Sequence, residues 1–238
     1  MTHLGRHQRP FRETADDQVP FPELNPWLHR WVEFGRPAVR SQEAMELKGR
    51  WREAFERPAP VHLEIGSGNG FFLSEFARRH PELNLLGVEI RYKRLVTAAL
   101  KVRKLGLGNA LLTRYDAWWL DDLFEPGELS GLYLNHPDPW PKDRHVEKRL
   151  LGPWFTEWAA GALVEGAPLW LKTDALSNVD GLLAAIEGQP FEVLARVEDI
   201  GANGCPWPVE DEIQTNFQAK FERKGLPVHG VVLRRSAS

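Results

Sequence analysis

The segment from His136 to His145, which reads HPDPWPKDRH, carries several chemically useful side chains close together. Its three prolines exclude a helix interior and a central strand, because proline lacks the amide donor and fixes φ. We therefore predict a rigid loop that presents the carboxylate of Asp138, the indole of Trp140 and several cations. A proline-braced surface loop with solvated charges is the alternative interpretation.

The element before this proline loop (residues 136–145) positions it. Residues 130–135, which read SGLYLN, form a short apolar run that predicts a β-strand leading into the loop. Open α/β sheets bind their ligands beyond the carboxyl ends of their strands. Asp138 is therefore expected at a ligand site.

A second motif lies upstream. Residues 61–65 form a β-rich run that ends in Gly66-Ser67-Gly68-Asn69-Gly70, here called the glycine turn. The stretch after the turn is predicted to be a helix, because its apolar residues recur at helical spacing. Glycines let a backbone approach a ligand closely, and the start of a helix supplies amide donors. Strand, turn and helix together indicate a nucleoside-binding βαβ unit.

An acid follows at the spacing that such a unit requires. Residues 84–90 predict a second strand, and Glu89 near its end stands nineteen residues after Gly70. A carboxylate in this position can accept hydrogen bonds from ribose hydroxyls.

Two residues bear on the identity of the nucleoside. Phe71 occupies the place of the third glycine in the dinucleotide fingerprint G-x-G-x-x-G, and the carboxylate of Glu64 would repel a pyrophosphate. The same carboxylate can balance the positive charge of S-adenosylmethionine, so the pattern favours that cofactor over NAD. The alternative for Glu64 is a strand-end residue that caps the turn.

Two later strands also end in acids. Residues 108–117 predict a third strand with Asp116 just past its end, where a carboxylate can reach the exocyclic amine of an adenine. The alternative for Asp116 is a helix N-cap, and both roles can hold together. Residues 167–174 predict a later strand that ends in Asp174. Four predicted strand ends thus carry acids. This favours a single site lined by all four acids over four separate, solvated side chains.

With these motifs the sequence resembles the bacterial tRNA (guanine-N7)-methyltransferase family. The resemblance covers about residues 60–235; the proline loop is highly specific to that family, whereas the glycine turn is common to many methyltransferases. It implies a class I methyltransferase fold, and methyl transfer from S-adenosylmethionine to N7 of guanosine at position forty-six, in the variable loop of tRNA. The matching segments are LEIGSGNG (63–70), GVEI (87–90), YDA (115–117), LNHPDPWPKDRHVEKRL (134–150), KTD (172–174) and TNFQAKFERKG (215–225).

The resemblance also implies roles for individual residues. It makes Asp138 the catalytic or cofactor-site acid. The further expected cofactor contacts are Glu64, Gly66, Gly68, Glu89 and Asp116. The expected substrate contacts are Lys142, Arg144, His145, Lys148, Arg149, Asp174, Thr215 and Gln218.

Two residues depart from the family's pattern. Gln218 stands where the motif T-x-[FY]-E has an acid, and an amide can still donate and accept hydrogen bonds to guanine. His136 stands where many members carry Phe before the Pro-Asp pair. His136 is either a satisfied loop histidine or a contact to nucleic acid.

The chemistry of guanine sets what the acids must do. N7 already holds an in-plane lone pair, so methyl transfer needs no proton removal, and the enzyme's task is to align N7, the methyl carbon and sulfur. A carboxylate can hold the base by accepting hydrogen bonds from its N1–H and its exocyclic amine. Asp138 and Asp174 are the candidates for this contact.

Composition sets limits on the function. The 238 residues suffice for one domain with a sizeable core, and the single Cys205 excludes an intrachain disulfide and fits a reducing cytoplasm. We find no membrane-spanning run, no signal-like N-terminus and no Cys/His spacing for a metal. The net charge of −3 argues mildly against nucleic acid, but phosphate binding depends on local charge.

Cations are concentrated in three segments. Arg6, Arg9 and Arg12 lie in the polar N-terminal segment, residues 91–104 hold the second run, and the proline loop with its sequel to Arg149 holds the third. A run of cations is usually a solvated face. Three runs favour a surface that follows phosphates.

The expected fold is α/β and Rossmann-like, with a mostly parallel sheet, an antiparallel C-terminal strand and helices on both faces. Residues 1–23 are expected to be a flexible arm and residues 24–238 a single methyltransferase domain. Further expected elements are an ordered start at 26–32, one helix over 41–56, and two final strands at 191–195 and 229–233 that pair antiparallel.

Three other functions predict different behaviour. A methyltransferase acting on an exocyclic amine or a small molecule would bind tRNA weakly and have a closed pocket. A catalytically silent tRNA-binding subunit would not bind S-adenosylmethionine, and the intact glycine turn argues against this alternative. A nicotinamide dehydrogenase is disfavoured by Phe71 and Glu64. The sequence leaves the choice between monomer and homodimer open.

Overall fold

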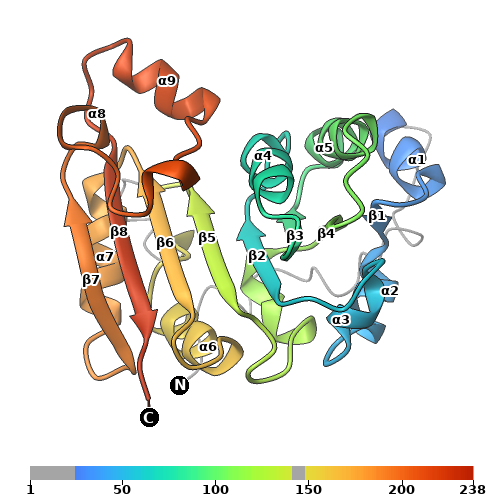
Figure 1. Cartoon of the computed structure of the whole chain (residues 1–238), viewed down its shortest axis with the longest axis horizontal. Helices are drawn as coiled ribbons and strands as arrows, with labels where there is room; N and C mark the ends of the chain where they lie inside the picture. Colours follow the sequence, from blue (N-terminus) through green and yellow to red (C-terminus); the bar gives the residue numbers. More distant parts are fainter. Residues whose placement is uncertain (1–24, 141–147, 238) are drawn as a thin grey trace. The chain divides into compact units, whose positions relative to one another are not determined.

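A computed structural model describes residues 25–140 and 148–237 of the chain (Figure 1). These residues form two compact units, one made of residues 25–125 and the other of residues 126–237. The arm expected at residues 1–23 lies outside the described residues, and the single domain over 24–238 stays a prediction. None of the helices in the described part of the chain is both long enough and apolar enough to span a membrane.

The first unit is a parallel sheet with its crossover helices. Its strands lie in the order β1-β4-β3-β2, and each neighbouring pair is parallel. The strands β2 and β3 are buried along their whole length, as expected for strands covered on both faces. The elements are α1 (Pro26–Glu33), β1 (Ala38–Val39), α2 (Ser41–Glu46), α3 (Trp51–Ala54), β2 (Val61–Ile65), α4 (Phe71–Arg79), β3 (Asn84–Glu89), α5 (Tyr92–Lys104), β4 (Ala110–Arg114) and the 3₁₀ helix η4 (Ala117–Asp122).

The single helix predicted over residues 41–56 is wrong. The structure has two short helices there, and Gly49 between them adopts φ of 76°. A left-handed glycine ends a helix readily, because it has no Cβ to clash. The second helix begins at Trp51, whose side chain is fully buried. Packing of this side chain against the core sets the new direction of the chain.

The second unit is a mixed sheet. Its strands lie in the order β5-β6-β8-β7; β5 and β6 are parallel, and β8 runs antiparallel to both β6 and β7. This confirms the predicted mostly parallel sheet with an antiparallel C-terminal strand. The elements are β5 (Gly131–Asn135), α6 (Pro153–Ala162), β6 (Pro168–Thr173), α7 (Leu176–Ala185), β7 (Phe191–Val197), α8 (Ile200–Asn203), the 3₁₀ helix η6 (Val209–Asp211), α9 (Asn216–Glu222) and β8 (His229–Arg235).

Candidate active site

The glycine turn in the first unit has the backbone that its sequence predicts. Gly66, Gly68 and Gly70 adopt φ of 75°, 54° and 68°, a region that residues with a Cβ rarely enter. The amide N–H groups of Gly66 and Ser67 donate to the carbonyl of Val88, at 2.8 and 3.0 Å. The turn is therefore tied to β3 and held in a conformation that only glycine adopts without strain.

The helices around the turn pack closely against it. A Cβ on Gly70 would lie 2.6 Å from the Cβ of Ala98 in α5. A Cβ on Gly87 of β3 would lie 2.3 Å from Leu73 of α4. Glycine at these two positions lets α4 and α5 approach the strand and the turn, so the backbone of the turn is firmly supported.

The carboxylate of Glu89, at the end of β3, accepts a hydrogen bond from the glycine turn. Its side chain is only 5% exposed, and its Oε2 accepts from the amide of Gly68 at 3.1 Å. Its Oε1 accepts from the amide of Arg91 at 2.9 Å, and the guanidinium of Arg94 lies 3.6 Å away. Each carboxylate oxygen has two lone pairs, so Glu89 keeps accepting capacity for the predicted ribose hydroxyls.

Glu64 in β2 and Asp116 after β4 belong to the strands on the two sides of β3. Glu64 is buried in β2, where it pairs in register with Gly87. Burial lowers the pKa of Lys101, and the negative charge of Glu64 partly opposes this effect. Asp116 is buried after β4, and its Oδ1 accepts from the amide of Trp118 at 3.0 Å, which makes it the N-cap of η4. The adenine contact of Asp116 stays a prediction beside this N-cap role.

The proline loop in the second unit is anchored at its start. The amide of His136 donates to the carbonyl of Lys172 at 2.7 Å. The amide side chain of Asn178, in α7, donates to the carbonyl of Pro137 at 2.9 Å and to the hydroxyl of Thr173 at 3.1 Å. Asp138 itself is exposed. The backbone before this carboxylate is therefore fixed to β6 and α7, while the carboxylate faces solvent.

His136 contacts both Asp174 and α9. Its side chain is 4% exposed, and its Nδ1 lies 3.0 Å from Oδ1 of Asp174, so this nitrogen donates to the carboxylate. Its ring stacks on Phe217 and Phe221 of α9, at 5.7 and 6.0 Å between centroids. Burial lowers the pKa of His136, and Asp174 partly opposes this effect. The structure thus gives Nδ1 of His136 a partner, while its Nε2 is buried without a hydrogen-bond partner among the described residues, so the choice between a loop histidine and a contact to nucleic acid stays open. One oxygen of Asp174 is already engaged.

Two cations that follow the proline loop in the sequence contact Trp140. The ammonium of Lys148 lies 5.0 Å from the centroid of the Trp140 ring, and Nε of Arg149 donates to the Trp140 carbonyl at 3.1 Å. Lys148 thus lies over the indole of Trp140, and Arg149 binds the backbone of the same residue. Three other predicted substrate contacts, Lys142, Arg144 and His145, lie outside the described residues.

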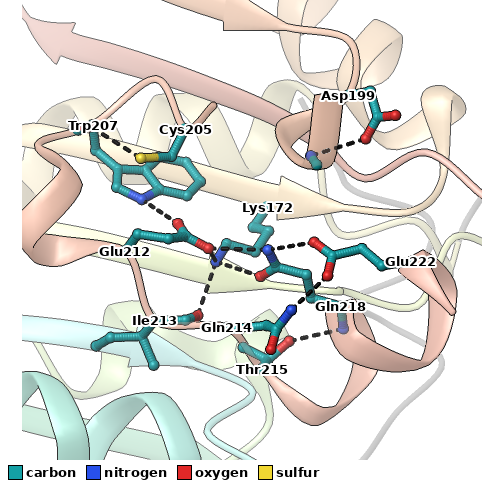
Figure 2. A network of polar contacts seen from close by, with 11 residues as sticks. Lys172, Asp199, Cys205, Trp207, Glu212, Ile213, Gln214, Thr215, Gln218 and Glu222 are labelled. Carbon is teal, nitrogen blue, oxygen red and sulfur yellow. Dashed lines mark hydrogen bonds and ion pairs between the residues drawn. The ribbon is translucent and has the colours of Figure 1, made fainter. Parts of the chain in front are cut away.

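A buried polar network surrounds Lys172 at the end of β6 (Figure 2). The side chain of Lys172 is 3% exposed, and its ammonium donates to Oε1 of Glu212 at 2.9 Å, the carbonyl of Ile213 at 3.0 Å and Oε1 of Gln218 at 2.8 Å. All three of its hydrogens are used. Burial lowers the pKa of Lys172, and Glu212 opposes that effect.

Gln218 joins this Lys172 network to α9. Its Nε2 donates to Glu212 and Glu222, both at 3.0 Å, so both N–H donors of the side-chain amide are used (Figure 2). The hydroxyl of Thr215 accepts from the amide of Gln218 at 3.1 Å and caps α9. The predicted substrate contacts of Thr215 and Gln218 stay predictions, and a guanine acceptor bound by the N–H groups of Gln218 would have to displace one of these bonds.

Glu212 was absent from the predicted site. It accepts from Lys172 and Gln218 through Oε1, and from the indole of Trp207 through Oε2 at 2.7 Å. A lysine inside an apolar strand signals a buried acid partner. The sequence offers no spacing that locates that partner forty residues downstream.

The replacement Gln218→Glu tests the network. It removes the two N–H donors and sets a third carboxylate against Glu212 and Glu222, each 3.0 Å from the present amide nitrogen. We expect the free energy of unfolding at pH 7.5 to fall by about 1–2 kcal/mol, because the acids repel and lose donors. Urea unfolding measures the loss, with Gln189→Glu outside the network as the control. Unchanged or higher stability would contradict this interpretation.

Comparisons with known proteins bear directly on these motifs. Residues 58–231 match the model of a family described as "Putative methyltransferase". A tRNA (guanine-N(7)-)-methyltransferase of Listeria monocytogenes is 36% identical over 205 residues, which cover 86% of this chain and 93% of that protein. One from Geobacillus kaustophilus is 38% identical over 183 residues, covering 76% and 82%.

The chain belongs to the tRNA (guanine-N7)-methyltransferase family. The fold agrees with this family membership. The crystal structure of the 16S rRNA methyltransferase KamB superimposes with a TM-score of 0.58 over 83% of this chain and 94% of that one, at 16% sequence identity. At that identity the likeness supports the methyltransferase fold alone. The matched residues of the family include both the glycine turn and the proline loop.

Proposed function

We propose that this protein transfers the methyl group of S-adenosylmethionine to N7 of guanosine at position forty-six in the variable loop of tRNA, in the cytoplasm. One observation carries the proposal: the family match over residues 58–231 spans an intact glycine turn and an intact proline loop. The substrate follows from the names of the relatives. The chemistry of the described residues is consistent with it.

The first unit suits the cofactor, which supplies an electrophilic methyl group on a sulfonium. Gly66 and Gly68 adopt a left-handed backbone, and because glycine has no Cβ, no side chain stands between the turn and a bound nucleoside. Glu89 takes the ribose hydroxyls and Asp116 the adenine amine. Glu64 balances the positive charge of the sulfonium and ammonium groups.

The second unit suits the guanosine. Asp138 stands on a loop whose preceding backbone is fixed by β6 and α7, and its carboxylate faces solvent. A carboxylate held this way can accept from N1–H and the exocyclic amine of guanine, and orient N7. It also compensates the positive charge that the purine gains as N7 becomes methylated. Asp174 is the second candidate for this contact.

Cations of the proline loop suit the phosphates of the tRNA. Lys148 and Arg149, which follow the proline loop, both contact Trp140, so charge and an aromatic ring lie together there. Lys142, Arg144 and His145 precede them in the sequence. Single-stranded RNA is commonly bound by this combination of cations and aromatic rings.

The direct test is methyl transfer from labelled S-adenosylmethionine to unmodified tRNA transcripts, followed by mapping of the methylated atom. We expect label at N7 of the variable-loop guanosine. A transcript with adenosine at position forty-six is the matched control and should stay unlabelled. Label on an exocyclic amine, or tRNA binding without transfer, would overturn the proposal.

Glu89→Ala tests the cofactor assignment. It removes the acceptor for the ribose hydroxyls and also the acceptor for the amide of Gly68. We expect the affinity for S-adenosylmethionine to weaken by about 1–3 kcal/mol, because buried donors lose their partner. Titration calorimetry measures the affinity, and Glu75→Ala on the outer face of α4 serves as the control. Unchanged affinity in Glu89→Ala would refute the ribose contact.

A further inference from the structure

Helix α1 packs beside α5 (Figure 1). The surface formed there carries cations held on aromatic rings. The ammonium of Lys93 and the guanidinium of Arg30 lie 5.6 and 5.4 Å from the ring centroid of Trp27. The guanidinium of Arg103 lies 3.9 Å from that of Phe34. We call these five residues the α1–α5 patch.

The charge around this patch is one-sided. Residues 25–40 and 91–104 contain a single Asp or Glu, Glu33, although the whole chain has a net charge of −3. Such a local excess in an acidic protein attracts a polyanion, because phosphate binding depends on local charge. The cations of these two segments are Arg30, Arg36, Arg40, Arg91, Lys93, Arg94, Lys101, Arg103 and Lys104.

The side chain of Arg103 is ordered by two contacts within the protein. Its guanidinium stacks on Phe34, and its Nη2 donates to the carbonyl of Arg36 at 3.1 Å, yet the residue is exposed. A solvated arginine on a helix needs neither contact. Because the long side chain is already ordered, a phosphate that binds its remaining N–H groups costs less rotamer entropy.

A pocket adjoins the patch. It is lined by Arg30, Glu33, Phe34, Val96, Leu100 and Arg103. Two arginines with an aromatic ring and two aliphatic side chains match the mixed character of a sugar-phosphate chain, whose phosphates are anionic and whose sugars present C–H groups. Glu33 is the one acidic residue of the lining. The chemistry fits nucleic acid better than an acidic peptide, which offers no repeated apolar sugar face.

We propose that the α1–α5 patch binds the sugar-phosphate backbone of the tRNA, with Arg30 and Arg103 as its phosphate contacts. The inference rests on the proposed function for its partner and adds a docking surface in the first unit. Bound there, the backbone contributes affinity and orientation rather than chemistry. Loss of the patch should therefore weaken tRNA binding and leave the cofactor site intact.

The double variant Arg30→Ala/Arg103→Ala tests this surface, with an unmodified tRNA transcript as the probe. We expect the Kd for tRNA to rise about tenfold near physiological salt and the slope of log Kd against log salt to fall by about one to two. S-adenosylmethionine affinity and the rate at saturating tRNA should not change. Arg52→Ala/Arg57→Ala removes two exposed arginines outside the patch and should bind tRNA like the wild type.

A second pair of variants keeps both arginines. Leu100→Glu puts a carboxylate into the pocket at a residue that is 49% exposed, so the fold should tolerate it. Leu194→Glu makes the same change on β7 at a residue that is 47% exposed. We expect Leu100→Glu alone to raise the Kd for tRNA, because the new charge repels phosphates.

The outcomes separate the two proposals. If the wild type methylates tRNA and both patch variants bind it as tightly as their controls, the patch is not a tRNA surface and the proposed function stands. If the wild type methylates no tRNA, the proposed function fails. Salt-dependent loss of tRNA binding in the patch variants would then still support the surface as a nucleic-acid contact.

Discussion

Replacement of Asp138 by alanine should lower the rate of methyl transfer to tRNA by about two orders of magnitude or more, the range for removal of one preorganised electrostatic group. The carboxylate stands between Pro137 and Pro139, so its backbone has little freedom left to lose. The amide of His136 and the side chain of Asn178 fix the preceding residues. A group held this firmly can locate guanine within a fraction of an ångström.

The variant should still fold, because Asp138 is exposed and no hydrogen bond within the described residues depends on it. Single-turnover rates at saturating S-adenosylmethionine measure the effect. Asp180→Ala, an exposed aspartate in α7, is the matched control. Turnover near the wild-type value in Asp138→Ala would defeat the assignment and make Asp174 the better candidate.

Asp138→Asn separates two roles of the carboxylate. The amide keeps the size and one acceptor oxygen but loses the charge. A substantial residual rate would favour orientation of the base, whereas a rate as low as that of the alanine variant would favour electrostatics.

Regular elements were predictable where short-range physics decides them. The strand Val61–Ile65 and the helix after the glycine turn follow from apolar periodicity and from glycines that the backbone requires. Glu89 was placed by its spacing from Gly70, and the structure adds that it binds the amide of Gly68. Local sequence therefore predicted this unit and the acids at its edge.

Contacts between distant segments were not predictable. The pair of His136 and Asp174 joins residues that follow two neighbouring strands, β5 and β6, and no local pattern specifies which acid meets the histidine. Gln218 was expected to face guanine, yet in the structure its amide lies 2.8 Å from Lys172, forty-six residues away in the sequence. Tertiary packing decides both interactions, so the motif alone could not assign them.

The Lys172 network should also govern the stability of the second unit. Lys172→Met keeps the aliphatic length of the side chain but leaves Glu212 without its positive partner and removes the donor to the carbonyl of Ile213 and to Oε1 of Gln218. We expect the free energy of unfolding to fall by about 3 kcal/mol, the low end for breaking a buried ion pair, because Glu212 keeps some solvent contact. Urea unfolding measures the loss, and Lys224→Met at an exposed site is the control.

A second substitution decides whether the uncompensated acid causes that loss. In Lys172→Met/Glu212→Gln the stranded carboxylate becomes a neutral amide, whose desolvation costs less. The double variant should therefore recover part of the stability that Lys172→Met loses, and it should unfold in a single transition. If the free energy of unfolding of the double variant is instead lower than that of Lys172→Met by as much as Glu212→Gln alone costs the wild type, Glu212 and Lys172 act independently. The charge pair would then not be what joins β6 to the segment between η6 and α9.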